Sequence, residues 1–280
     1  MLNTTFPPRA TSQLPHLGTY VREMAVSVAR MYENALDWAH LPYLHSSSFS
    51  AIELLTSEAD IWRARVWNAA PRRDVTSVIE LRLDRVCRRW ITRTLEGANA
   101  GSEIWTHCNV LAERRLIVVV DFFAPAIVAD ARARAGEAYA SLYARLYDED
   151  ERMMLERQLQ LDQRAASSAP PVRAAPVHAA VNLGPARVLP ALLPLDVTVG
   201  ARRYRVAMSD DQRICAYALT CPHALGPLDD EPIVAGQITC PWHGYRFDVR
   251  TGQCVAPSMS SCQLPVLAIV TDGEGNALLV

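Results

Sequence analysis

Two short segments of the chain carry thiol and imidazole side chains at spacings typical of a metal centre. One reads Cys-Pro-His from Cys221, and the other, after sixteen intervening residues, reads Cys-Pro-Trp-His-Gly from Cys240. Each segment therefore offers one thiolate and one imidazole, the latter from His223 and His243. Two thiolates on one iron and two imidazoles on the other hold one type of [2Fe-2S] cluster. The same four side chains can also bind zinc.

The residues around these segments favour the iron–sulfur cluster over zinc. Gly226 and Pro227 follow the first segment, and Gly-Tyr-Arg-Phe-Asp follows the second from Gly244. Gly and Pro beside a cluster let backbone N–H groups approach the sulfur atoms. In both halves, and in the hairpin that follows, the chain resembles the Rieske [2Fe-2S] proteins. The resemblance implies that the cluster is bound by Cys221, His223, Cys240 and His243.

Four positions near the predicted cluster indicate its redox class. High-potential Rieske proteins carry an extra Cys in each loop, joined as a disulfide, and the matching residues here are Gly226 and Trp242. Those proteins also have a Ser and a Tyr that hydrogen-bond the cluster sulfurs, where this chain has Tyr245 and Phe247. Fewer such hydrogen bonds imply a lower reduction potential. The resemblance is therefore to the oxygenase and ferredoxin branch.

A second set of metal-binding side chains lies nearer the N-terminus. The pattern N-x-x-D-x-x-H-x4-H comprises Asn34, Asp37, His40 and His45. Pro42 is expected to end a helix near His40, because the residue before proline avoids the α region, so that His45 lies beyond a bend. Two imidazoles from either side of a helix break can converge on one ion, and a carboxylate would complete a facial triad for Fe(II). The alternative interpretation is a pair of polar residues at a helix end.

In a chain that also has the Rieske motif, this spacing resembles the mononuclear iron motif of the Rieske non-haem iron oxygenases. The resemblance implies that His40 and His45 bind Fe(II). It implies that Asp37 is a bridging carboxylate between an iron-binding His and a cluster His. It also implies a helix-grip, START-like catalytic domain and a homotrimer. Known members usually place the Rieske domain first, whereas this chain has the reversed order.

The family's third iron ligand is an Asp on the long C-terminal helix of the catalytic domain, and residues 148–151 are all acidic here. The expected helix has an apolar stripe formed by Tyr139, Leu142, Tyr143, Leu146, Met153 and Met154. Asp150 falls within this stripe. The family's helix usually has a Glu five and a Gln seven positions after the ligand, and Glu156 and Gln158 would then select Glu151. We prefer Asp150 for its residue type and helical phase, with Glu151 second, and a solvated acidic run is the alternative.

Hydrophobic periodicity predicts the elements that carry these residues. Apolar residues at three- and four-residue steps predict a helix over 20–40. Alternating apolar and charged residues over 79–83 and an apolar run over 116–123 predict strands. A long helix is expected over 128–163, broken only weakly at Gly136. The order is therefore helix, antiparallel sheet, long helix.

A change in composition divides the chain into two domains. Residues 165–180 are rich in Pro and Ala, which is typical of a linker. We expect a START-like catalytic domain with mononuclear iron over 1–164. We expect a small all-β Rieske domain over 181–280, with short antiparallel strands such as 204–208 and 214–219. The predicted fold class is α+β.

Composition excludes several classes of function. The formal net charge is −2, and Arg residues are interleaved with acids, so nucleic acid is not expected as a partner. Two of the seven Cys are assigned to the cluster, and the other five are expected to be reduced, mostly buried thiols. The longest apolar run, 116–120, has the length of a strand, so no membrane span is expected. The first twenty residues lack a signal layout, and a cytoplasmic location is the resulting expectation.

The resemblance implies an oxidoreductase, a Rieske non-haem iron mono- or dioxygenase that uses O2 to hydroxylate, demethylate or desaturate a small organic substrate. A Gly-rich nicotinamide-binding fingerprint is absent from the sequence, so an external ferredoxin or NAD(P)H-dependent reductase is implied. An apolar substrate is expected. Its pocket would be lined by Trp62, Trp105, Phe122, Phe123, Tyr143 and Met154, and the alternative interpretation is that these are ordinary core residues. The alternative is a Rieske electron-transfer module fused to a START-like hydrophobic-ligand binding domain without a second iron. An assembly or regulatory protein with a vestigial site is a third hypothesis.

Overall fold

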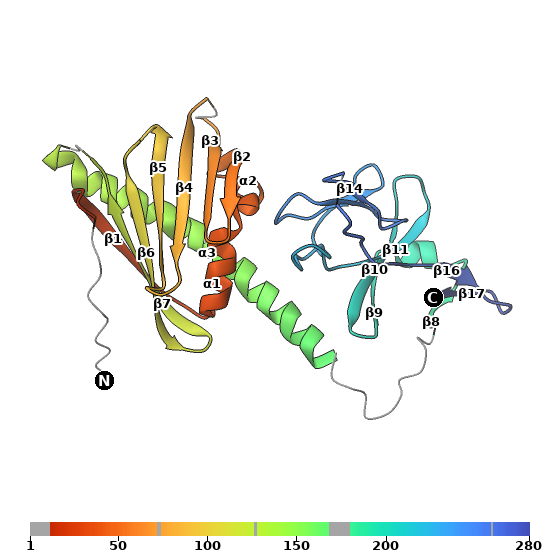
Figure 1. Cartoon of the computed structure of the whole chain (residues 1–280). Coiled ribbons are helices and arrows are strands. Elements are labelled where there is room, and N and C mark those ends of the chain that lie inside the picture. Colours follow the sequence, from red (N-terminus) through yellow and green to blue (C-terminus); the bar gives the residue numbers. More distant parts are fainter. Residues whose placement is uncertain (1–11, 72–73, 126–127, 168–179, 259) are drawn as a thin grey trace. The chain divides into compact units, whose positions relative to one another are not determined.

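The computed structural model describes residues 12–71, 74–125, 128–167, 180–258 and 260–280 (Figure 1). The chain forms two compact units, Met1–Leu155 and Glu156–Val280, and each is considered by itself. The Pro/Ala linker predicted over 165–180 falls mostly on residues 168–179, which lie outside the described residues. The domain limits 1–164 and 181–280 therefore stay a prediction.

The first unit is a seven-stranded antiparallel sheet with a long helix against one face. Its strands are β1 (His16–Met24), β2 (Phe49–Glu58), β3 (Ile61–Asn68), β4 (Thr76–Asp84), β5 (Arg89–Gly97), β6 (Glu103–Ala112) and β7 (Arg115–Phe123). They pair in the order β1-β7-β6-β5-β4-β3-β2, so the first two strands in sequence are the two edges. Helices α1 (Val28–Leu36) and α2 (Leu41–Leu44) connect these edges, and α3 (Ala129–Ser167) follows β7. This helix-grip arrangement confirms the predicted START-like fold.

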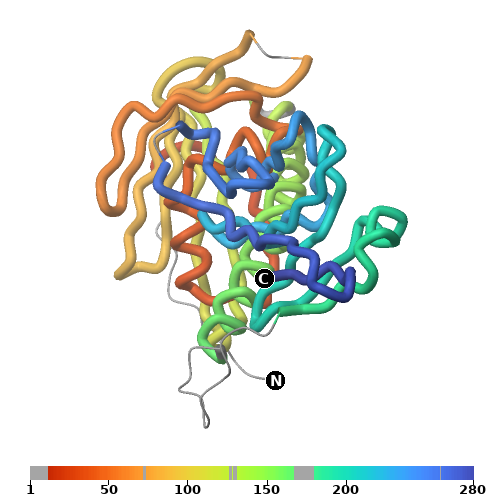
Figure 2. Tube along the Cα trace, turned by 90° about the vertical axis from the view of Figure 1, so that its right-hand side faces the viewer, coloured from red at the N-terminus to blue at the C-terminus, as the bar shows by residue number. Residues whose placement is uncertain are grey.

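The core of this unit lies between the sheet and α3. Along β7, Leu116, Val118 and Phe122 point into it at alternate positions, as a strand with one face on a helix requires. From α3, Tyr147 and Met154 pack against them. Figure 2 shows α3 in green inside the curve of the yellow and orange strands. The predicted buried strand over 116–123 is thus confirmed. Packing of α3 against the sheet determines the direction in which each α3 side chain points.

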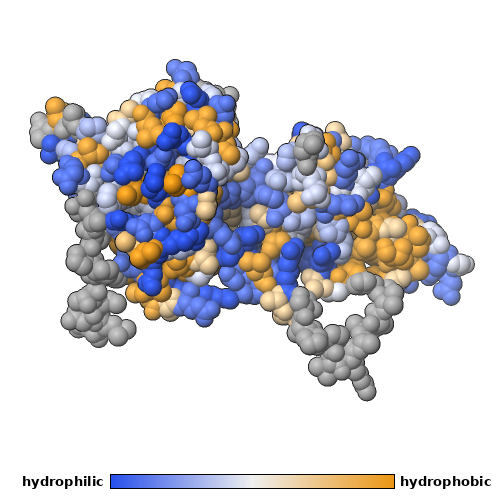
Figure 3. Space-filling model, viewed as in Figure 1, coloured by the Kyte–Doolittle hydropathy of each residue, from blue (hydrophilic) through white to orange (hydrophobic). Residues whose placement is uncertain are grey.

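The opposite face of the sheet carries ion pairs as well as buried aromatic side chains. Arg63 Nη2 lies 2.7 Å from Glu80 Oε2, and Arg93 Nε lies 2.8 Å from Glu103 Oε1, each pair joining neighbouring strands. Blue hydrophilic residues accordingly alternate with orange ones over the first unit in Figure 3. Among the described residues, none of the helices combines the length and apolar composition that a membrane span needs.

The helix predicted over 20–40 is wrong in its first part. Residues 16–24 form β1, because pairing with β7 over eight positions outweighs the helical spacing of their apolar side chains. Helix α1 begins at Val28, after Ser27, whose hydroxyl accepts the Arg30 N–H at 3.3 Å. It ends at Leu36, earlier than predicted. Pro42 does not end this helix; it lies in the first turn of α2, where a missing N–H costs no hydrogen bond.

Gly136 marks the point where α3 crosses β1 closely. A Cβ at this position would lie 2.3 Å from the carbonyl oxygen of Leu17, and one on Gly18 would lie 3.4 Å from the Gly136 Cα. The helix runs without interruption through Gly136, so this glycine permits contact with the strand and does not break the helix.

We expect Gly136→Ala to destabilise the first unit by about 1–3 kcal/mol, the usual cost of overpacking. The added methyl group meets backbone, which cannot rotate away, and this outweighs the gain in helix propensity of about 1 kcal/mol. Urea unfolding followed by far-UV circular dichroism measures the change. Gly273→Ala in the second unit is a control, because no heavy atom lies within 4 Å of its added Cβ. A Gly136→Ala chain as stable as the control would contradict this interpretation.

Apart from the last part of α3 and the 3-10 helix η2 (Leu189–Leu192), the second unit consists of small antiparallel sheets. One contains β9 (Leu195–Val199), β10 (Arg202–Met208), β11 (Ile214–Ala218) and β15 (Val266–Leu267). A second contains β12 (Gln237–Thr239), β13 (Arg246–Asp248) and β14 (Cys254–Ala256), and a third contains β8 (Val181–Pro185), β16 (Ile269–Thr271) and β17 (Asn276–Leu279). The predicted all-β architecture is confirmed. The loops after β11 and β12 carry the Cys and His residues.

Candidate metal centres

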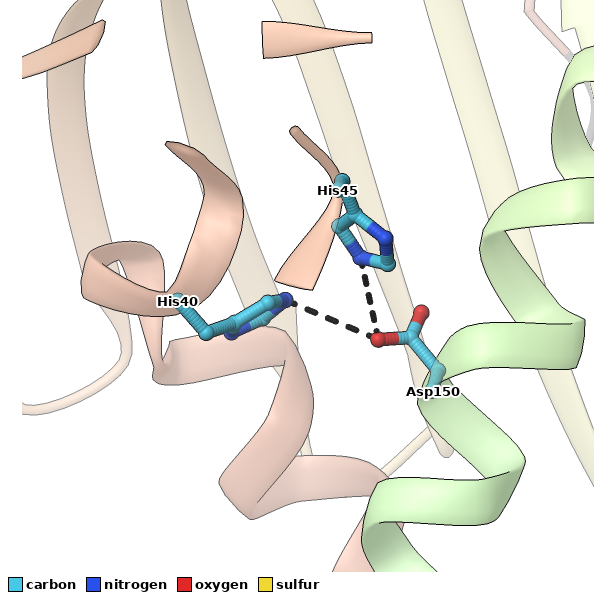
Figure 4. Close-up of side chains that lie close together, drawn as sticks. All are labelled: His40, His45 and Asp150. Atoms are coloured by element: carbon cyan, nitrogen blue, oxygen red, sulfur yellow. Dashed lines mark ion pairs between the residues drawn. The ribbon is translucent and has the colours of Figure 1, made fainter. Parts of the chain in front are cut away.

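Three side chains that are far apart in sequence meet in the first unit. His40 ends the short 3-10 helix η1 (Trp38–His40), His45 follows the last residue of α2, and Asp150 lies on α3. The fractional exposure is only 3% for His40, 1% for His45 and 7% for Asp150. Figure 4 shows the two imidazoles and the carboxylate pointing toward one another. Burial of two imidazoles with one carboxylate is costly unless a shared partner binds them.

The distances in this cluster suit a metal-binding set. Asp150 Oδ1 lies 3.1 Å from His45 Nε2 and 3.6 Å from His40 Nε2. The three potential ligand atoms all lie within 4.8 Å of one another. Two imidazoles and one carboxylate form the facial triad of non-haem Fe(II) sites. The residue types, their burial and their convergence therefore fit mononuclear iron.

The far side of each imidazole faces a second carboxylate. Glu149 Oε2 lies 2.6 Å from His45 Nδ1, and Asp37 Oδ2 lies 3.6 Å from His40 Nδ1. A carboxylate at Nδ1 favours the tautomer with its proton there, which leaves Nε2 free to bind a metal. Burial lowers the pKa of His45, but the contacts with Asp150 and Glu149 outweigh it and raise the pKa above its usual value.

Two residues of the acidic run on α3 are engaged elsewhere. Arg22 on β1 forms ion pairs with both: its Nη2 lies 2.6 Å from Glu151 Oε2, and its Nη1 lies 2.5 Å from Asp148 Oδ1. The backbone N–H of Ala25 also donates to Glu151 Oε1 at 3.2 Å. Consecutive helical residues point about 100° apart, so β1 and the histidines take different members of the run. The structure brings Asp150 to the histidines and does not bring Glu151 there.

Two further observations concern the surroundings of this site. The Asn34 side-chain N–H donates to Asp150 Oδ1 at 2.8 Å, so the first residue of the sequence pattern holds the carboxylate. Of the expected pocket residues, Trp62, Phe122, Tyr143 and Met154 pack in or against the core beside α3. The rings of Trp105 and Phe123 pack together on the opposite face of the sheet, with centroids 6.2 Å apart. Their assignment to a pocket beside α3 is therefore wrong.

In the second unit, two loops of similar construction hold the Cys and His residues. The N–H of Cys221 donates to Gly226 O at 2.8 Å, and the N–H of Cys240 donates to Tyr245 O at 2.8 Å. Each Cys carbonyl accepts an N–H four residues later, from Leu225 or from Gly244, at 3.0 Å. Each loop thus closes over its own cysteine by the same pair of backbone hydrogen bonds.

The four side chains of these loops separate by type. The thiols of Cys221 and Cys240 are hydrogen-bonded to each other and are almost fully buried, at 0% and 1% exposed. The His223 and His243 rings meet edge to face, with centroids 4.8 Å apart. Paired thiols beside paired imidazoles match the two irons of a cluster with mixed ligands.

The backbone of the second loop is arranged to favour a thiolate. The hydrogen bond from the Cys221 thiol, with N–H donors of Trp242 and His243, lowers the pKa of Cys240. Gly226 leaves room for this sulfur, since a Cβ there would lie 3.0 Å from Cys240 Sγ. The chemistry of these donors and the space around them fit a [2Fe-2S] cluster.

Comparison with known families agrees with this geometry. Residues 180–268 match the family described as the Rieske [2Fe-2S] domain. This part of the chain is a Rieske domain. The Rieske domain implies a [2Fe-2S] cluster, and the loops after β11 and β12 supply its expected ligands.

Individual relatives cover the chain in parts. Over 62 residues, 22% of this chain, it is 37% identical to the oxygenase component of dicamba O-demethylase from Stenotrophomonas maltophilia. The match spans only 18% of that relative's length. One chain of a solved complex of reduced oxygenase and oxidized ferredoxin in carbazole 1,9a-dioxygenase is 30% identical, and the match covers 31% of this chain and 86% of that one, with a TM-score of 0.26. A START superfamily protein from Mycobacterium smegmatis is 15% identical, covering 50% of this chain and 99% of that one, with a TM-score of 0.40.

The sequence did not single out Glu149. It precedes Asp150 in the acidic run, but only the position of His45 after α2 gives it a partner. The five cysteines outside the cluster follow the prediction for the most part: Cys108, Cys215 and Cys254 are buried, Cys262 is half-buried and Cys87 is exposed. Burial raises the pKa of Cys108 to about 12, which keeps this thiol protonated and unreactive.

Proposed function

We propose that this chain is a Rieske non-haem iron oxygenase with the catalytic domain before the Rieske domain. Mononuclear Fe(II) is bound by His40, His45 and Asp150. The observation that carries the proposal is the convergence of these three buried side chains in a chain that also has a Rieske domain. A facial triad leaves open coordination positions on its iron, and a Rieske cluster supplies electrons one at a time. Together these two properties suit O2 activation.

When bound, Fe(II) supplies open coordination positions for O2 beside the substrate, and the cluster supplies electrons one at a time. The protein's residues position and protect these groups. Glu149 holds the Nδ1 atom of His45, and Asp37 lies 3.6 Å from the Nδ1 atom of His40. Both Nε2 atoms face Asp150. The amide of Asn34 fixes the orientation of the Asp150 carboxylate. Burial of all three ligands excludes bulk water, which limits side reactions.

The partners of this oxygenase follow from its redox needs. A separate ferredoxin or NAD(P)H-dependent reductase donates electrons to the Rieske domain, and O2 and a small, apolar organic substrate are consumed. Asp37 acts as the bridging carboxylate between His40 and a cluster histidine. Its side chain is 30% exposed, which is compatible with a second contact beyond His40. A homotrimer is the assembly that the family resemblance favours.

Iron and acid-labile sulfide per chain test the proposal. We expect anaerobically purified protein to contain about three irons and two sulfides per chain. The double variant His40→Ala/His45→Ala should contain two irons and two sulfides, because the Rieske ligands are untouched. Two irons in both proteins after attempted Fe(II) loading would exclude the oxygenase. The START-like unit would then be assigned to binding a hydrophobic ligand beside an electron-transfer module.

The contact between Glu149 and His45 leads to a prediction for iron affinity. We expect Glu149→Gln to weaken Fe(II) binding by about 10–100-fold, the range found when a carboxylate behind a metal-bound histidine is lost. Anaerobic Fe(II) titration of cluster-loaded protein measures this. Asp148→Asn is the matched control, because this neighbouring carboxylate is 61% exposed and pairs with Arg22. Equal affinities in the two variants would show that Glu149 does not support the histidine.

A further inference from the structure

One aromatic ring covers a cluster ligand of the Rieske domain. The ring of Tyr245 lies nearly parallel to that of His223, with centroids 4.0 Å apart and planes inclined by 13°. His223 is the exposed member of the histidine pair, whereas His243 is only 7% exposed. Tyr245 therefore shields one face of the ligand that water can reach.

The Tyr245 ring is held in place from several sides. Its hydroxyl is hydrogen-bonded to the Ser260 side chain. The centroid of its ring lies 6.2 Å from that of Phe247, with the two planes inclined by 26°, and Phe247 is completely buried in the domain. Its carbonyl accepts the N–H of Cys240 at 2.8 Å, which closes the second cluster loop. A ring fixed at its tip, its side and its backbone can hold the plane of His223 in turn.

The charge of the cluster determines what this shielding does. With two thiolates and two neutral imidazoles, a [2Fe-2S] cluster is formally neutral when oxidised and carries one negative charge after it accepts an electron. Removing water from a charged group disfavours the charged state. Solvent exposure is accordingly one of the factors that set the reduction potential of such clusters. A group that covers His223 thus favours the oxidised cluster.

The electron distribution of the Tyr245 ring also favours the oxidised cluster. The face of an aromatic ring is electron-rich, and here it lies against an imidazole that donates to iron. An electron-rich neighbour stabilises the more positive, oxidised iron. Loss of the ring therefore raises the potential by both effects, whereas loss of the hydroxyl alone leaves both in place.

We propose that Tyr245 is a positioning residue that fixes the orientation of His223 and lowers the reduction potential of the Rieske cluster. This role is distinct from the hydrogen bonds to sulfur that set the potential of other Rieske proteins. The proposal depends on the Rieske domain alone and is independent of the mononuclear iron.

Redox titration of the full, cluster-loaded chain tests the role of Tyr245. We expect Tyr245→Leu to raise the equilibrium constant for one-electron reduction about tenfold, which is a rise of about 59 mV in midpoint potential. We expect Tyr245→Phe, which keeps the ring, to have the wild-type potential. Electron paramagnetic resonance of the reduced cluster should show altered g-values in Tyr245→Leu and wild-type g-values in Tyr245→Phe. Visible circular dichroism checks that all samples carry the cluster.

A second ring-free variant guards against failure of the first. Tyr245→Met fills similar volume without stacking, and we expect a smaller rise in potential. The proposal is overturned if both ring-free variants keep the wild-type potential, or if Tyr245→Phe shifts as far as Tyr245→Leu. Failure of both ring-free variants to assemble a cluster also overturns it, since Tyr245 would then serve folding alone. All measurements can be repeated in His40→Ala/His45→Ala, where the outcome does not depend on the second iron.

Discussion

Asp150→Ala is expected to lose the proposed mononuclear iron, while Glu151→Ala retains it. The two residues are adjacent and both acidic, but Asp150 Oδ1 lies 3.1 Å from His45 Nε2, whereas Glu151 pairs with Arg22 at 2.6 Å. Removing a direct ligand should weaken Fe(II) binding by more than about 100-fold, the upper end of what loss of an indirect support causes. Iron and sulfide per chain, followed by Fe(II) titration, measure the difference.

The sulfide content separates this effect from general damage. Both variants should keep two sulfides per chain, since neither residue touches the Rieske loops. Glu151→Ala should show a lower melting temperature, because Arg22 is only 23% exposed and loses a partner. If Glu151→Ala loses the iron and Asp150→Ala keeps it, the ligand assignment must be reversed. If both keep it, the third ligand is not in the acidic run.

Gly226→Ala is expected to reduce cluster content about tenfold or more. The added Cβ would lie 2.9 Å from the Trp242 ring and 3.0 Å from Cys240 Sγ, so a buried ring or a cluster ligand must move. Cys240 has little room to move, because its N–H donates to the Tyr245 carbonyl and closes the loop, and the residue is only 1% exposed. Displacement of a residue that supports a ligand commonly lowers metal affinity 10–100-fold. Acid-labile sulfide and visible absorbance per chain measure the loss.

Gly273→Ala again provides the control for a glycine in the same unit, since its added Cβ meets no heavy atom within 4 Å. It should carry as much cluster as the wild-type chain. Full cluster content in Gly226→Ala would mean that the loop relaxes around the methyl group. The close approach of Gly226 to the sulfur would then have no part in cluster binding.

Much of the candidate chemistry could be predicted because it depends on local spacing. Cys-Pro-His and Cys-Pro-Trp-His each form one tight loop, so the sequence distance within a segment directly limits the distance between its side chains. The same holds for His40 and His45, which lie on either side of the short helix α2. The apolar run over 116–123 likewise predicted the buried strand β7.

Long-range pairing could not be predicted from the same patterns. Residues 16–24 have the apolar spacing of a helix, but as β1 they complete the edge of the sheet beside β7. Trp105 and Phe123 are aromatic and buried, yet they lie on the face of the sheet away from α3. Strand β1 depends on pairing with residues about a hundred positions away, and the face on which Trp105 and Phe123 lie depends on the register of β6 and β7. Neither is encoded in a local pattern.

The sequence by itself determined the two sets of metal-binding residue types, their order along the chain and the α+β class. It limited the third carboxylate of the first site to the acidic run on a helix. Only the tertiary structure decided which carboxylate faces His40 and His45, because the rotation of α3 about its axis depends on packing against the sheet and on Arg22 of β1. It also decided that Glu149 contacts His45 and that Tyr245 covers His223, since both contacts join side chains whose orientation is set by the surrounding fold.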